Sequence, residues 1–119
     1  MLKAQDIHVM AISVLDTTDS AVIRIVTNYP KETAQLLKSR SISFTERTII
    51  AVEIKDEDSL YMITRSLLHA EINIHYVYPF LYQPNNRPVL AIAMEDEDIG
   101  EDTLHRHGMK ILSLEDFTR

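Results

Sequence analysis

The pattern of apolar and polar positions is clearest in the middle of the chain, at Ile49–Tyr82. Residues Ile49–Ile54 form a β-branched, apolar run that is long enough for one strand and too short for a typical helix. Acidic residues follow at Asp56–Asp58, where negative charge suits the positive end of a helix. Apolar residues then recur at helical spacing, which predicts a helix that covers a sheet, at Leu60, Ile63, Leu67 and Ala70. From Asn73 the period changes to two, which predicts a second strand with one side formed by Ile74, Tyr76, Tyr78, Phe80 and Tyr82.

Four elements are predicted before this stretch. Strands at Ile7–Leu15 and Ala21–Thr27 flank a segment rich in turn-forming residues, and the pair predicts a hairpin. A helix is expected over Pro30–Arg40, because proline lacks only an N–H that the first turn does not need. The predicted buried side of this helix consists of Ala34, Leu36 and Leu37. A third strand is predicted at Ile42–Glu46.

Three further elements are predicted after the central stretch. A strand at Val89–Met94 leads into a short helix that runs through Leu104. Gly108 predicts the end of this helix, because glycine readily adopts the positive φ found beyond the last turn. The final strand is predicted at Met109–Leu114.

The two halves of the chain are related by an internal repeat. A shift of 67 positions aligns them without a gap and gives five identities. The identical pairs are Ile7/Ile74, His8/His75, Val22/Val89, Ile25/Ile92 and Leu37/Leu104. The order of predicted elements agrees between the halves as well, which favours a true repeat.

The repeat predicts an α+β fold with a complete copy and a partial one. The copy at residues 48–119 has the order βαββαβ, which is ferredoxin-like: an antiparallel sheet with two helices on one face. The copy at residues 1–47 has only ββαβ, because nothing in it corresponds to the strand and helix of Thr48–Leu67. We expect the two copies to share one β layer.

The strand that contains Pro79 is expected at an edge of the sheet, since proline cannot donate a hydrogen bond to a neighbouring strand. This edge is unusually aromatic, and an exposed aromatic edge promotes aggregation. We therefore expect it to pair with the other half of the chain or with another chain. The second possibility predicts a homodimer or a higher homo-oligomer formed through sheet edges.

Composition limits the classes of function. The 119 residues suit one compact domain or two very small ones, and no apolar run approaches the length of a membrane span. The absence of cysteine excludes disulfides and thiolate sites and fits a reducing, cytoplasmic location. A net charge of −6 argues against nucleic-acid binding. The only glycines, Gly100 and Gly108, cannot form a phosphate-binding loop, and no cofactor is predicted.

Neither a metal site nor a catalytic centre is predicted. His105 and His107 are two residues apart and would lie on different sides of a helix. A calcium loop at Glu95–Arg106 would place Ile99 and Arg106 where oxygen ligands are required. The equivalent His8 and His75 favour a structural role, such as a hydrogen bond at the sheet edge. There is no G-x-S-x-G motif, so we expect a protein that is not an enzyme.

Two short motifs resemble the tandem ACT-domain proteins, which are small regulatory modules that bind amino acids. The stretch A-E-I-N-I at Ala70–Ile74 resembles the family's A-G-I-N-I, with Glu71 in place of glycine. The ending H-G-M-K-I-L-S-L-E-D-F at His107–Phe117 resembles the close of such proteins, and A-Q-D-I-H at Ala4–His8 is a weaker version of the same strand entry. The turn at Lys55–Ser59 departs from the family, because it lacks the usual Pro-Gly and carries three carboxylates.

The resemblance implies a cytoplasmic, non-catalytic regulator that binds a small ligand, with an amino acid as the expected ligand, between adjacent ACT units. It implies a ligand site at Asp56, Asp58 and Ser59 together with the strand entry at Asn73. Backbone N–H groups at the start of the helix would hold a carboxylate, and Asp58 would hold an ammonium group. Two alternatives remain: an assembly module without a ligand, and a regulatory fragment of an amino-acid biosynthetic enzyme that has lost its first strand and helix.

Overall fold

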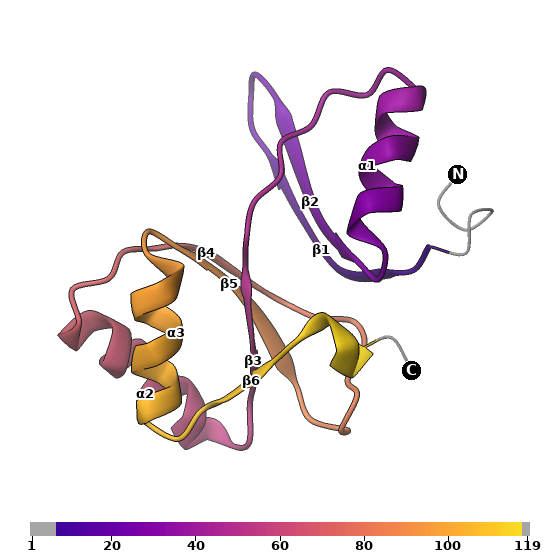
Figure 1. The fold of residues 1–119 in the computed structure, drawn as a ribbon. Coiled ribbons are helices and arrows are strands. Elements are labelled where there is room, and N and C mark those ends of the chain that lie inside the picture. Colours follow the sequence, from indigo (N-terminus) through magenta and orange to yellow (C-terminus); the bar gives the residue numbers. More distant parts are fainter. Residues whose placement is uncertain (1–6, 118–119) are drawn as a thin grey trace.

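The computed structural model describes residues 7–117, so that residues 4–6 of the predicted strand entry at Ala4–His8 lie outside it. Within these residues three α-helices and six β-strands follow one another in the order ββαβαββαβ, and a short 3₁₀ helix comes after the last strand (Figure 1). In order, the elements are β1 (Val9–Asp16), β2 (Ala21–Thr27), α1 (Pro30–Ser39), β3 (Ile50–Glu53), α2 (Glu57–His69), β4 (Ile74–Pro79), β5 (Val89–Met94), α3 (Glu97–Arg106), β6 (Lys110–Leu112) and η2 (Leu114–Phe117).

The second copy of the repeat forms a complete ferredoxin-like unit. Its four strands make one antiparallel sheet in the order β4-β5-β3-β6. Helices α2 and α3 lie side by side against one face of this sheet (Figure 1). Strand β4, which contains Pro79, lies at the edge as predicted. The core between the sheet and the two helices is formed by Ile50, Val52, Ile54, Ile63, Leu67, Ile72, Ile92, Met94 and Leu104.

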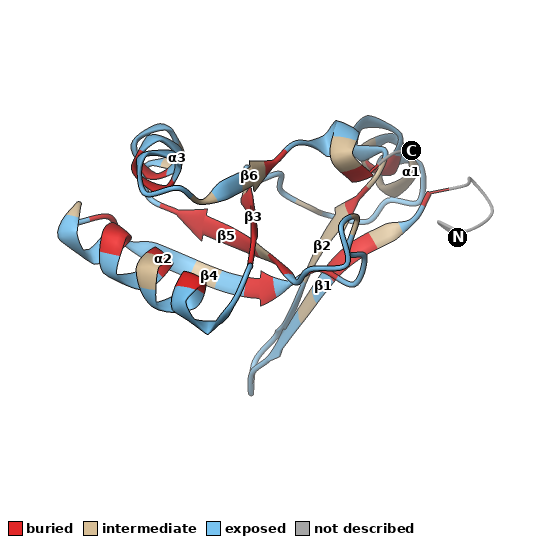
Figure 2. Ribbon diagram, turned by 90° about the horizontal axis from the view of Figure 1, so that it is seen from below, coloured by how far each residue is buried: buried red, intermediate tan, exposed pale blue. Residues whose placement is uncertain are grey.

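The opposite face of the four-stranded sheet is also apolar, and Figure 2 shows buried positions along β3 and β5 that serve both faces. Side chains from β1 and η2 pack on this second face. Phe80 and Phe117 stack there with ring centroids 4.8 Å apart. The cluster as a whole consists of Met10, Ala11, Ala51, Tyr78, Phe80, Val89, Ala91, Leu112 and Phe117.

The first copy forms a separate two-stranded sheet, so the expectation of one shared β layer is wrong. Strands β1 and β2 pair only with each other over most of their length, and α1 lies against β2 (Figure 1). The two sheets meet at one antiparallel bridge between Ala11 and Phe80. Beside it the Leu81 N–H donates to the Met10 carbonyl oxygen at 2.6 Å. The aromatic edge thus meets the other half of the same chain at Phe80, just beyond β4, whereas within the described residues Ile74–Pro79 pair only with β5.

The register of the repeat is confirmed by the helix ends. A shift of 67 positions carries the bounds of α1 onto those of α3, and Ser41 onto Gly108. Ser41 and Gly108 both have positive φ, at 57° and 81°, and Glu71 has φ 58° at the same place after α2. In each case the next N–H reaches back to a carbonyl of the last turn, as in the Ile72 N–H to Leu67 oxygen contact of 3.0 Å. All three helices thus end in one motif, with glycine used only once.

The predicted strand at Ile42–Glu46 is not formed. In the complete unit the equivalent strand, β6, pairs only with β3. The described part of the first unit contains no counterpart of β3, so residues 42–46 have no strand beside them. The segment therefore runs as irregular chain from α1 to β3.

Two smaller expectations also require correction. Leu60 is 46 % exposed, because the buried side of α2 is formed by Ser59, Ile63, Ser66 and Leu67 instead. The last strand is shorter than predicted, because the chain turns into η2 at Leu114. Asp116 stabilises this turn, since its carboxylate accepts a hydrogen bond of 2.8 Å from the Ser113 N–H.

Candidate functional site

The predicted ligand-binding turn connects β3 to the start of α2, and two of its residues cap the helix. Asp56 is the N-cap, and its Oδ1 accepts hydrogen bonds from the Ser59 N–H at 3.0 Å and from the Ser59 hydroxyl at 3.1 Å. The backbone N–H groups of Lys55 and Asp56 lie 3.3 Å from the Ser59 Oγ. This reciprocal arrangement is a capping box. Asp56 and Ser59 therefore stabilise the helix start whether or not a ligand is present.

Asp58 and Asn73 have different surroundings. Asp58 is exposed in the first turn of α2. Asn73 lies beyond the other end of that helix, where its amide donates a 2.6 Å hydrogen bond to Glu95 Oε2. Helix α2 has 13 residues, which corresponds to roughly 20 Å at about 1.5 Å per residue. One unit therefore brings together Asp56, Asp58 and Ser59, but not Asn73.

A cavity of about 890 Å³ lies between the two units. It is bounded by β2, by the inner side of α1, by residues 42–47 and by the second face of the four-stranded sheet. Its walls are mainly apolar and include Ile25, Phe44, Tyr78 and Phe117. This volume lies within the range of small-molecule sites in proteins, which is roughly 300–1,000 Å³.

Two arginines lie beside Tyr76 at the wall of this cavity, and the sequence did not point to them. The Arg24 guanidinium carbon is 4.0 Å from the centre of the Tyr76 ring, and that of Arg47 is 5.9 Å from it. Arg47 also contacts the Nδ1 of His75. The only signal in the sequence was the aromatic period of β4, because Arg24 and Arg47 approach it through tertiary structure alone.

Tyr78 is the neighbour of Tyr76 on the same face, and their ring centroids are 5.9 Å apart. Burial raises the pKa of the Tyr78 phenol, and the nearby Tyr76 raises it further, whereas the positive charge of Arg24 acts in the opposite direction. The phenol therefore stays neutral at physiological pH. The cavity wall at this point presents a neutral, amphipathic surface next to cationic groups.

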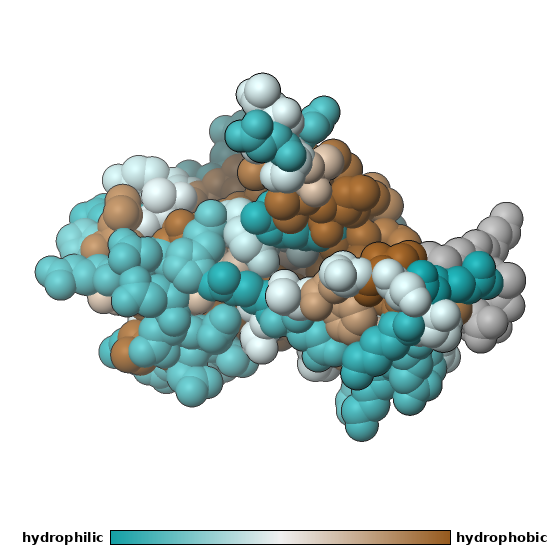
Figure 3. Space-filling view, turned by 90° about the horizontal axis from the view of Figure 1, so that it is seen from above, coloured by the Kyte–Doolittle hydropathy of each residue, from teal (hydrophilic) through white to brown (hydrophobic). Residues whose placement is uncertain are grey.

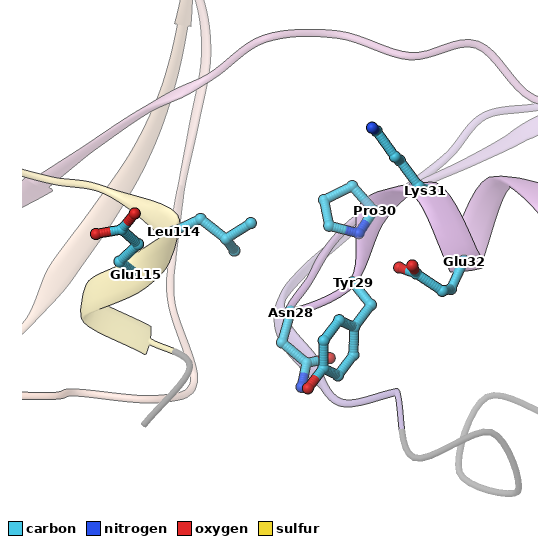
Figure 4. Close-up of a pocket in the computed structure, with 7 residues that line it drawn as sticks. All are labelled: Asn28, Tyr29, Pro30, Lys31, Glu32, Leu114 and Glu115. Carbon is cyan, nitrogen blue, oxygen red and sulfur yellow. The ribbon is translucent and has the colours of Figure 1, made fainter.

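A second, smaller cavity of about 520 Å³ lies between the start of α1 and η2. Figure 4 shows Leu114 extending from η2 towards Pro30, with Asn28 and Tyr29 along the same wall. Its lining also includes the polar residues Lys31, Glu32 and Glu115. The cavity lies between the two units at this end.

Residues 7–117 contain no group of three or more histidine, aspartate or glutamate side chains placed to hold a metal ion. His105 and His107 belong to the end of α3, where the His107 Nδ1 lies 2.8 Å from the Thr103 carbonyl oxygen. Within the same described range, none of the helices combines the length and the apolar character needed to cross a lipid bilayer.

Sheet order, helix placement and the repeat together define a complete ferredoxin-like α+β module that follows a related, partial unit. A family model described as an ACT domain pair matches residues 1–117, and the chain belongs to this family. Membership supports a regulatory, ligand-binding role in general, and ACT domains are typically non-catalytic. The crystal structure of protein BT0572 from Bacteroides thetaiotaomicron has a similar fold, with a TM-score of 0.85 at 18 % identity over 97 % of this chain and 79 % of that chain. No curated protein matches the sequence.

Proposed function

We propose that this protein is a non-catalytic, cytoplasmic regulator that binds a free amino acid between adjacent ACT units. The supporting observation is the turn between β3 and α2, where an exposed carboxylate stands at a helix start in a chain of the ACT family. The cytoplasmic location in this proposal rests on the absence of cysteine.

The chemistry of the turn suggests how each end of an amino acid is held. Asp56 already occupies the N–H of Ser59, but the first helical N–H groups, at Glu57 and Asp58, have no acceptor within the helix. In our proposal these two groups bind the ligand carboxylate, aided by the positive end of the helix. The exposed carboxylate of Asp58 binds the ammonium group.

In our proposal, the Asn73 side chain at a ligand site belongs to a neighbouring unit. Because it lies at the far end of α2 from Asp58, a single ligand cannot touch both within one unit. We propose a homodimer or higher homo-oligomer in which the strand entry of one unit faces the turn of another. Strand β6 pairs with β3 alone, whereas the opposite edge of the sheet ends at the bridge between Ala11 and Phe80, so we propose that this assembly uses the edge of β6.

Calorimetry against the twenty amino acids tests the ligand. We expect heat and a saturable isotherm with at least one of them, and we expect Asp58→Asn to weaken that binding at least tenfold. Asp98→Asn is a matched control, because Asp98 holds the same exposed place in the first turn of α3. No heat with any amino acid would remove the ligand from the proposal and favour a pure assembly module.

Light scattering of the purified chain tests the assembly. We expect a mass of at least two chains, and an increase in the associated fraction when the bound amino acid is present. A monomer at every concentration, with normal amino-acid binding, would exclude a site shared between chains.

A further inference from the structure

Two arginines from separate segments lie against one aromatic ring of the four-stranded sheet. Arg24 comes from β2 and Arg47 from the irregular segment before β3, and their guanidinium carbons are 4.0 Å and 5.9 Å from the centre of the Tyr76 ring. Tyr76 packs against the cluster around Phe80, on the face of the sheet that is turned away from α2 and α3. The pair of arginines is therefore separate from the candidate turn, which leads into α2.

A β-bulge brings a histidine to the same group of side chains. The register of β4 against β5 shifts between Ile74 and Tyr76, so that His75 is an extra residue in the strand. Such a bulge changes the direction of the side chains beside it. Here the Arg47 guanidinium contacts both the Nδ1 of His75 and the ring of Tyr76. Because a guanidinium can only donate hydrogen bonds, this Nδ1 is the acceptor, and His75 fixes the position of Arg47.

Neither arginine has an anionic partner among residues 7–117. No carboxylate oxygen in that range lies within 4.0 Å of either guanidinium, although acidic residues outnumber lysine and arginine by 18 to 12 in the whole chain. Even Glu46, the neighbour of Arg47 in the sequence, is not paired with it. A guanidinium that lies over a ring uses its face, so the N–H donors at its edge remain available. Two cations of a net acidic protein thus lie against one ring without a counter-charge.

The surface around the two arginines is largely apolar. Arg24 is half-buried, and Val22, two residues away on the same face of β2, is an exposed apolar side chain. Figure 3 shows hydrophobic surface gathered on the part of the molecule that carries the first unit. Tyr78 extends the aromatic surface, because it stacks on Tyr76. Charges beside apolar surface are screened less than charges in open water, so an anion is attracted more strongly here.

We propose that Arg24 and Arg47 bind the carboxylate or phosphate group of a small organic anion, whose apolar part lies against Tyr76. Arginine suits both head groups, because its N–H donors match a pair of oxyanion oxygens. Within the described chain no carboxylate is placed beside the two arginines to hold an ammonium group. The expected ligand is therefore an organic anion without a positive charge, and this site is additional to the proposed amino-acid site.

NMR titration of the full chain tests the site, with the arginine Nε–H signals and the backbone amides of β2 and β4 as the readout. Benzoate and phenyl phosphate are the probes, at constant ionic strength, and benzyl alcohol is the uncharged control. We expect saturable shifts of the Arg24 and Arg47 signals with at least one probe and none with benzyl alcohol. The probe that binds identifies the head group as a carboxylate or a phosphate.

Arg24→Gln and Arg47→Gln are each expected to weaken binding about tenfold or more, because each removes charged hydrogen bonds to the anion. Arg65→Gln is the matched control and is expected to leave the affinity unchanged. Arg65 is an exposed arginine 5.9 Å from the ring of Tyr61 and 3.5 Å from a ring nitrogen of His69. Its neighbours thus resemble those of Arg47, but among residues 7–117 no second arginine lies over that ring.

His75 is a positioning residue in this proposal, because it acts through Arg47. We expect His75→Ala to weaken binding less than the loss of either arginine does. We expect His75→Asn to restore the affinity, because the amide oxygen of asparagine can accept the hydrogen bond in place of Nδ1. A purely structural role of the ring would not be rescued by the smaller amide.

Three outcomes would overturn the proposal. The first is the absence of saturable shifts with both probes, and the second is wild-type affinity in Arg24→Gln and Arg47→Gln. The third is an equal loss of affinity in Arg65→Gln, since binding would then follow the overall charge and not this pair. Asp58→Asn is expected to leave the affinity for the probes unchanged, so a failure here is distinguishable from a failure of the proposed amino-acid site. Circular dichroism verifies that each variant is folded.

Discussion

At the scale of single residues, helix ends illustrate what sequence does and does not reveal. Gly108 was predicted as a helix stop because glycine tolerates positive φ, and its φ is 81°. Glu71 adopts φ 58° at the equivalent place after α2, and no property of glutamate predicts this. Only the comparison with the family's A-G-I-N-I marked the position. Residue identity therefore predicts positive φ at a glycine, which adopts it readily, but not at a glutamate.

Glu71→Gly is expected to stabilise the protein by about 0.5–1 kcal/mol. The left-handed conformation costs a residue with a Cβ about 1–2 kcal/mol, part of which glycine loses again through the greater freedom of the unfolded chain. Urea unfolding measures the difference. Arg65→Gly is the control, because Arg65 is exposed in the interior of α2 and glycine there is expected to cost about 1 kcal/mol. If both variants had a lower free energy of unfolding than the wild type, the positive φ of Glu71 would not be a source of strain.

Tyr78 gives stability a dependence on alkaline pH. Its pKa is raised in the folded state, so the folded protein keeps the phenolic proton after the unfolded chain has released it. The resulting stabilisation is fully present below about pH 10, the pKa of an unperturbed tyrosine, and is lost as the pH rises through the higher folded value. We expect the unfolding free energy of the wild type to fall more steeply above about pH 10 than that of Tyr78→Phe. Parallel curves from urea titrations at several pH values would refute this.

At the scale of elements, hydrophobic period predicted helices and strands well wherever an element could find its neighbours. Strands β2 and β5 have the predicted bounds, and α2 buries Ile63 and Leu67 of its predicted stripe. Residues 42–46 have an equally good strand pattern and form none. A strand is stabilised by hydrogen bonds to a neighbour, and that neighbour is not part of the local sequence. The hydrophobic period alone therefore predicts that a segment can form a strand, and not that it does form one.

Leu67 and Leu68 are adjacent in α2, so a comparison of substitutions at the two positions separates the effect of burial from that of helix propensity. Leu67 is fully buried beneath the helix, whereas Leu68 faces solvent. We expect Leu67→Ala to lower the free energy of unfolding by about 2–5 kcal/mol, through lost burial and the cavity left behind. Leu68→Ala is expected to change it by less than about 0.5 kcal/mol. Thermal or urea unfolding measures both, and similar effects of the two would mean that α2 is packed differently.

At the scale of the whole molecule, the ferredoxin-like order of the second unit followed from the sequence, but the arrangement of the two units did not. The repeat indicated one β layer, whereas the structure has two sheets that meet at Ala11 and Phe80. The candidate turn was located correctly after β3, yet its distance from Asn73 depends on the length and direction of α2. The cavity with Arg24 and Arg47 could not be predicted, because segments from both units form it.

Phe80→Ala tests the junction between the units. Phe80 is buried, stacks on Phe117 and pairs with Ala11 across the junction. Its loss is expected to cost about 3–5 kcal/mol of stability. We also expect faster hydrogen exchange in β1 than in β5, because β1 depends on this contact to stay attached to the larger sheet. Uniformly faster exchange in both strands would mean that the two units unfold together.

The single bridge at Ala11 and Phe80 has a mechanical consequence. Few backbone hydrogen bonds join the two sheets, and the side chains of Met10 and Ala11 supply the remaining contact, so we expect the angle between the sheets to change more easily than the structure within either sheet. We therefore expect a molecule that binds between the units to change the angle between the two sheets. X-ray scattering of the free and occupied chain would detect this as a change in particle dimensions at constant secondary structure.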